Sequence, residues 1–255
     1  MTAYRNRITA VKARALFWAL LALVLIALSA FLWRNSTQSD ILRADPEAIL
    51  GNPALRATAL ARGQSVYMGH CASCHGDTGK GDRTLGAPDL TDNDHLYGTG
   101  AVAQIEDIAR YGIRAGNKHG WNLAVMPAYA SKNPDAAEPL PPQTPAQIED
   151  MTQYLLSFTG RSTDRTAVDR GHDQYTKAGC WDCHGRDLGG DAAIGAPSLT
   201  DDIWLYGGSP DAVRHSISRG RAGVSPAFGR VLDAAQLRNV AVYVASLAPT
   251  KQDRK

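Results

Sequence analysis

Hydrophobic residues are concentrated in one uninterrupted run near the start of the chain. From Ala15 to Trp33 the sequence ALFWALLALVLIALSAFLW contains no charged residue, and about 19 apolar residues are enough to cross a bilayer as one helix. Basic residues precede the run, namely Arg5, Arg7, Lys12 and Arg14. Because Lys and Arg hold a flanking segment in the cytoplasm, the pattern predicts a cytoplasmic tail at 1–14, a transmembrane anchor at 15–33 and an exported remainder.

A cleaved signal peptide is the alternative interpretation of this run. Such a peptide has an apolar core of about 7 to 15 residues and ends in a small-x-small site, which 27–30 matches only loosely. The run is longer and ends in Phe-Leu-Trp-Arg, so a retained anchor is favoured. The next segment, 34–55, is polar, contains Pro46 and Pro53 and has no clear period, which predicts a linker.

Beyond the linker the pattern of polar and apolar residues occurs twice. The segment GAPDLTDNDHLYG at 86–98 is echoed by GAPSLTDDIWLYG at 195–207. Each copy also ends in a segment with apolar residues at helical spacing, 145–158 and 233–247. An internal repeat of this length indicates two copies of one domain in series, so we predict an all-α chain with domains at 56–160 and 161–255.

Composition is that of an ordinary globular chain, with 44% hydrophobic and 20% charged residues and a formal net charge of +2. A charge balance so close to neutral argues against nucleic acid as a partner.

The cysteines carry the clearest chemical signal. All four lie in two Cys-x-x-Cys-His motifs, Cys71-Ala-Ser-Cys74-His75 and Cys180-Trp-Asp-Cys183-His184, which is the attachment signature of c-type haem. A zinc site would require further Cys or His ligands nearby, and a thioredoxin-like site gives no reason for the trailing histidine. We therefore predict two covalently attached haem c groups, with His75 and His184 as iron ligands.

The order of elements in each copy resembles class I cytochrome c, in which a closing helix packs against the helix that leads into the haem motif. This resemblance implies Met126, in a Met-Pro pair, as the sixth ligand opposite His75, suited to one-electron transfer. Packing is the alternative role for a methionine, and it is the role we expect for Met68 and Met151.

The second copy departs from this pattern, because Ser225 stands where a methionine is expected and no methionine follows Met151. Its haem is expected to be five-coordinate, bound by another side chain, or bound by Ser225 or water. His215 is a candidate metal ligand here, and His172 is a weaker one.

The tandem arrangement behind an anchor, with Gly-Ala-Pro-x-Leu-Thr-Asp and Leu-Tyr-Gly in both copies, resembles the CcoP/FixP subunit of cbb-type (C-family) haem-copper cytochrome c oxidases. The resemblance implies a protein of the bacterial inner membrane with periplasmic haem domains. It would relay electrons in aerobic respiration from a donor cytochrome to a monohaem cytochrome c subunit and the catalytic haem-copper subunit, without itself reducing oxygen. The alternatives are a stand-alone dihaem carrier, a cytochrome subunit of a periplasmic dehydrogenase, and a haem enzyme or gas sensor that uses an open second iron.

Overall fold

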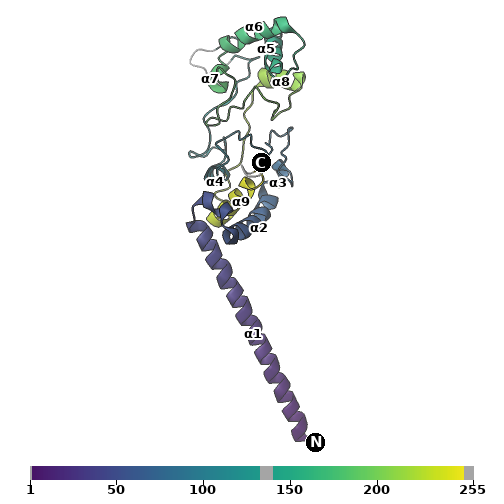
Figure 1. Ribbon diagram of the computed structural model, residues 1–255, viewed down its shortest axis with the longest axis vertical. Helices are drawn as coiled ribbons and strands as arrows, with labels where there is room; N and C mark the ends of the chain where they lie inside the picture. Colours follow the sequence, from purple (N-terminus) through teal and green to yellow (C-terminus); the bar gives the residue numbers. More distant parts are fainter. Residues whose placement is uncertain (1, 133–139, 250–255) are drawn as a thin grey trace.

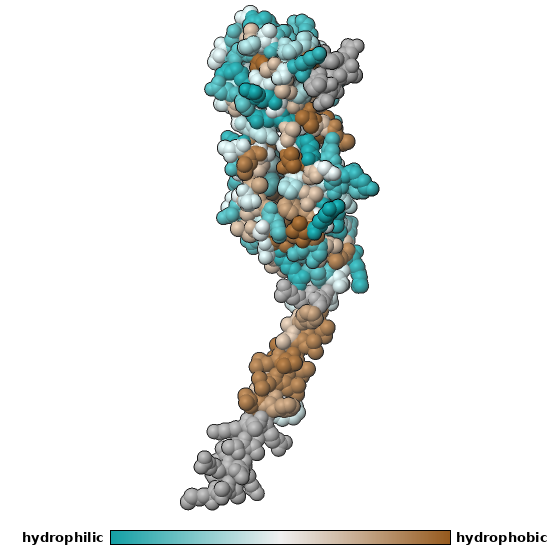
Figure 2. Space-filling view, turned by 180° about the vertical axis from the view of Figure 1, so that it is seen from behind, coloured by the Kyte–Doolittle hydropathy of each residue, from teal (hydrophilic) through white to brown (hydrophobic). Residues whose placement is uncertain are grey.

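The computed structural model describes residues 2–132 and 140–249, and it describes their side chains except at 2–15 and 34–35. The chain begins with a single long helix, α1 (Thr2–Arg43), which projects away from the rest of the molecule (Figure 1). Nearly all of its apolar side chains from Leu16 to Trp33 are exposed, and they form a continuous hydrophobic surface around the helix (Figure 2). Within the described residues this is the one helix long and apolar enough to span a membrane. The basic side chains expected to orient it lie outside the described side chains.

The segment 34–55, which the sequence predicts as a linker, is folded along most of its length. Helix α1 continues to Arg43, and a short 3-10 helix, η1 (Pro46–Gly51), follows it. Ile41 and Ile49 are completely buried in one apolar cluster with Val102 and Val242. The apolar residues of this segment show no regular period in the sequence, but Ile41 and Ile49 attach the end of the anchor to the helices that follow.

The other helices form two packed units (Figure 1). The anchor unit, next to α1, contains α2 (Pro53–His70), α3 (Ala72–His75), α4 (Val102–Tyr111) and α9 (Ala234–Ala245). The outer unit contains α5 (Pro145–Ser157), α6 (Arg165–Lys177), α7 (Trp181–His184) and α8 (Pro210–Arg219). The described residues show isolated β-bridges and no extended sheet, so the chain is all-α as predicted.

Each unit combines parts of both sequence copies. Helix α2 packs against α9, and α5 packs against α6, so each closing helix lies on the first helix of the other copy. The expectation of pairing within a copy is therefore wrong. Both crossings are built on a glycine: a Cβ at Gly63 would lie 2.1 Å from the Asn239 carbonyl oxygen, and one at Gly171 would lie 2.1 Å from that of Asp150. Only glycine lets the helix backbones approach this closely.

Two crossing segments link the units. Between α4 and α5 the described residues are 112–132 and 140–144, and between α8 and α9 they are 220–233. Where they cross, antiparallel bridges join Ile113 to Ser225 and Met126 to Arg221. The exchange resembles domain swapping, here inside one chain.

Candidate functional site

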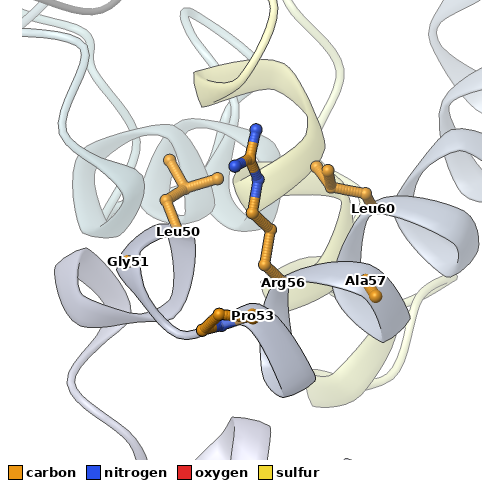
Figure 3. A pocket seen from close by; sticks show the side chains of 6 residues that line it. All are labelled: Leu50, Gly51, Pro53, Arg56, Ala57 and Leu60. Atoms are coloured by element: carbon orange, nitrogen blue, oxygen red, sulfur yellow. The ribbon is translucent and has the colours of Figure 1, made fainter. Parts of the chain in front are cut away.

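Both Cys-x-x-Cys-His motifs open into one cavity of about 880 Å³ between the two units. Its wall includes His75 and His184 together with the two Gly-Ala-Pro segments. A second cavity, of about 360 Å³, lies far from this chemistry between η1 and α2, where Arg56 stands between Leu50 and Leu60 (Figure 3). The cysteines and histidines of the two motifs are therefore brought together around the large cavity, and Met126 also lines it.

The two motif histidines are held in the same way. The Nδ1 atom of His75 lies 3.1 Å from the Pro88 carbonyl oxygen, and that of His184 lies 2.9 Å from the Pro197 carbonyl oxygen. A carbonyl oxygen can only accept a hydrogen bond, so Nδ1 carries the hydrogen and donates it, and Nε2 is left with its lone pair for a metal. Burial lowers the pKa of both histidines, although the carbonyl contact opposes this. Burial thus favours the neutral imidazole at both positions, and the carbonyl contacts leave Nε2 of each ring available to bind a metal.

The loops that supply these carbonyls have tight glycine turns. Gly81 has a φ of +74°, and a Cβ there would lie 2.3 Å from the Ala87 carbonyl oxygen. Gly190 occupies the matching position in the second copy, with a φ of +78°. Tyr67 and Tyr175 each donate a hydrogen bond of 2.6 Å to the carbonyl of the glycine that follows the motif histidine. These contacts fix the backbone on the histidine side of each site.

The cysteines do not have the properties of redox-active thiols. All four are free. Burial, followed by the proximity of Cys74, raises the pKa of Cys71 to about 11, and burial is also the main cause that raises the pKa of Cys180 to about 11. Reactive thiols have a lowered pKa instead. The raised thiol pKa values therefore argue against a dithiol redox site.

The segments expected on the opposite face of each haem are exchanged between the copies. Met126 is half-buried and packs on the core of the outer unit, together with Cys180 and Trp181 of the second motif. Three residues later, Tyr129 lies against Cys180. Burial is the main cause that raises the pKa of Tyr129, and the nearby Cys180 thiol is the second. Ser225 instead exchanges backbone hydrogen bonds with Ile113, 2.9 and 3.0 Å long, at the end of α4 in the anchor unit.

The other candidate histidines lie outside the cavity. His215 is exposed on α8, whereas Val213, Ser216 and Ile217 of that helix face the cavity. Because the apolar side of α8 faces inward, the structure does not bring His215 to the second haem site. His172 is also exposed, with its ring against Tyr154.

The cavity has features that fit a haem with its propionate carboxylates. The Nε1 atom of Trp204 is buried and lacks a hydrogen-bond partner among the described residues, and Trp204 lines the cavity. A buried donor without a partner is costly, and a carboxylate would satisfy it. Arg114 and Arg221 also line this mostly apolar cavity and supply positive charge, and Asp89 and Asp94 elsewhere in the lining supply negative charge.

Sequence reasoning missed one set of contacts between the copies. The Tyr206 ring packs over Gly86, where a Cβ would lie 2.3 Å from the ring, and the Tyr97 ring packs over Gly195, where that distance would be 2.1 Å. Each Leu-Tyr-Gly motif thus meets the Gly-Ala-Pro motif of the other copy. The sequence indicates these contacts only through the presence of both motifs in each copy, because two contacts related by twofold symmetry require each motif to occur twice.

Comparison with known proteins identifies two cytochrome segments. The family model for cytochrome c matches residues 60–159, and the model for subunit III of cbb3-type cytochrome c oxidase matches residues 166–244. The chain is 32% identical to the cbb3-type oxidase subunit FixP of Azorhizobium caulinodans, over 84% of this chain and 68% of that one. It is 36% identical to the subunit CcoP of Rhodobacter capsulatus, over 84% of this chain and 70% of that one. The chain is also 37% identical to the CcoP of Azospirillum brasilense, over 80% of this chain and 68% of that one.

Proposed function

Because the chain belongs to the CcoP/FixP family of cbb3-type cytochrome c oxidase subunits, we propose that it is the membrane-anchored cytochrome that passes single electrons into such an oxidase. It carries covalently attached haem c, as its cytochrome c segments require. The observation that carries the proposal is the single cavity that joins both Cys-x-x-Cys-His motifs. Two haems that share one cavity can exchange electrons directly.

The proposed sites contain one haem c each. Cys71 and Cys74 hold the first group, and Cys180 and Cys183 hold the second. His75 and His184 would bind the two irons through Nε2, and Met126 would supply a further iron ligand to one of them. When bound, each haem supplies a one-electron couple whose potential depends on the axial ligands and on burial.

The protein's own contribution is rigidity and orientation. Pro88 and Pro197 hold the histidine rings through their carbonyls, and the Tyr97 and Tyr206 rings lock the loops of the two copies together. Closely packed interiors resist deformation. An electron can therefore arrive and leave without the histidine side of either site being rearranged.

The proposed location is the bacterial inner membrane, with α1 as the single anchor and both units in the periplasm. Because Ile41 and Ile49 tie the helix to the anchor unit, the haem sites are held at a fixed height above the membrane. The proposed partners are a donor cytochrome on the periplasmic side, a monohaem cytochrome c subunit and the catalytic haem-copper subunit.

Purification of the tagged chain from its native membranes in a mild detergent tests this role. We expect copper and b-type haem to co-purify with the chain, and the preparation to consume oxygen when reduced donor cytochrome is added. A chain that purifies with its c-type haem but without copper or b-type haem would be a stand-alone carrier or a dehydrogenase subunit instead.

A further inference from the structure

The segment around Met126 belongs to the outer unit. The Tyr129 amide donates to the Ile217 carbonyl at 3.0 Å, and the Ala130 amide donates to that of Ser218 at 3.3 Å. Both acceptors lie on α8 of the second copy. Met126 itself packs on the cluster that contains Met151 and Tyr175 and borders Cys180. Its thioether is therefore placed on the wall of the second haem site.

The equivalent segment around Ser225 belongs to the anchor unit. The Phe228 amide donates to the Ala109 carbonyl at 2.9 Å, and the Gly229 amide donates to that of Arg110 at 3.0 Å. The Phe228 ring lies 5.9 Å from the ring of His70, the residue before Cys71. Phe228 thus stands by the first cysteine pair as Tyr129 stands by the second.

Charges at matching positions of the repeat explain why the helices exchange partners. Glu106 on α4 corresponds to Arg214 on α8, and Glu149 on α5 corresponds to Arg238 on α9. The structure pairs Glu106 with Arg238, and Arg214 with Glu149 at 2.6 Å. Pairing within each copy would place the two glutamates together and the two arginines together. Opposite charges therefore favour the exchanged arrangement, and like charges disfavour the alternative.

We infer that Met126, although it follows the first haem motif in the sequence, is the sixth ligand of the haem on Cys180 and Cys183. Ser225 faces the haem on Cys71 and Cys74, which consequently lacks a strong sixth ligand from this segment. A serine oxygen is a poor partner for haem iron beside a thioether. The inference rests on the proposed function only in requiring both haems.

Removal of one attachment site at a time tests the assignment in the full-length chain. In Cys71→Ala/Cys74→Ala, the remaining ferric haem should keep the sulfur-to-iron charge-transfer band of methionine ligation, and a further Met126→Ala should abolish it. In Cys180→Ala/Cys183→Ala, the band should be absent and Met126→Ala should change nothing. Met151→Leu, the control for the neighbouring methionine, should leave the band intact. The opposite pattern in the two attachment variants would overturn the inference.

A second measurement keeps both haems in place. The photo-crosslinker p-benzoylphenylalanine at position 129 should react with the peptide around Cys180, and at position 228 with the peptide around His70, as identified by mass spectrometry. Crosslinks from 129 to the Cys71 peptide, or from 228 to the Cys180 peptide, would show pairing within each copy and refute the inference. Failure of the proposed function would look different, because the wild-type chain would then lack haem or would not associate with the oxidase.

Discussion

Reversing the charges on both closing helices, with Glu149→Arg and Arg238→Glu in one variant, should destabilise the protein. In the exchanged arrangement this double variant places a glutamate at position 238 against Glu106 and an arginine at position 149 against Arg214. If each closing helix packed within its own copy, the same substitutions would create two attractive pairs instead. The sign of the stability change therefore distinguishes the two arrangements.

The magnitude comes mainly from the pair inside the anchor unit. The Glu106 and Arg238 side chains are only 10% and 14% exposed, and Arg238 also donates to the Ile41 and Ala44 carbonyls at the end of α1. Breaking a buried pair costs about 3 to 5 kcal/mol. Because Arg110 also pairs with Glu106, we expect a loss near the lower end of this range. The Arg214–Glu149 pair is 36% and 38% exposed, so it adds at most about 1 kcal/mol.

Thermal unfolding of the detergent-solubilised protein, followed by far-ultraviolet circular dichroism, is the assay. For a chain of this size the expected loss lowers the midpoint by roughly 10 °C. The quadruple variant, which adds Glu106→Arg and Arg214→Glu, restores opposite charges across the copies and should recover most of that loss. A double variant as stable as the wild type, or a quadruple variant without recovery, would refute the reasoning.

Three further predictions concern local structure. Helix α4 begins without a side-chain cap of its own, and the Glu47 carboxylate accepts hydrogen bonds from the Val102 and Ala103 amides at 3.0 and 2.9 Å. Glu47→Ala should lower the free energy of unfolding in urea by about 1 to 2 kcal/mol. An unchanged urea midpoint would contradict this. Gly171→Ala should force α6 away from α5 and cost about 1 to 3 kcal/mol, whereas Gly69→Ala, with open space around it, should be neutral or stabilising in the same assay. Hydrogen bonds from the Ala167 and Thr166 amides lower the pKa of Asp164, the N-cap of α6. The stability that this carboxylate contributes is therefore fully present above the ordinary aspartate pKa and is lost as pH falls through the lowered pKa. Asp164→Asn should make the melting temperature fall less steeply over that pH range, and an equally steep fall would show that other groups cause it.

The sequence was sufficient to predict the elements of the fold but not which copy each helix packs against. The haem motifs and closing helices follow from local patterns. Partner choice does not, because Gly63 with Tyr67 and Gly171 with Tyr175 give the two first helices the same packing surface. The discriminating signal was the charge at four equivalent positions, which becomes informative only when the two copies are aligned helix by helix.

The candidate site was predicted unevenly for a related reason. The Cys-x-x-Cys-His motifs carry their chemistry in adjacent residues, so the sequence indicates them directly. The haem site that Met126 reaches depends on the path of the chain through 112–125. The hydrophobic pattern of this segment has no period that predicts its path. The exposure of His215 follows from which side of α8 is apolar, and Val213 and Ile217 on that helix could have indicated it.

The relay itself is tested most directly by following the c-type haems of this chain during turnover. Fully reduced oxidase containing the chain is mixed with oxygen in a stopped-flow instrument, and the haem c absorbance is recorded for the wild type and for the two cysteine-pair variants. The account predicts that both haems are oxidised within a turnover and that loss of either one slows oxygen consumption with donor cytochrome. Haems that stay reduced while the oxidase turns over at its full rate would contradict it.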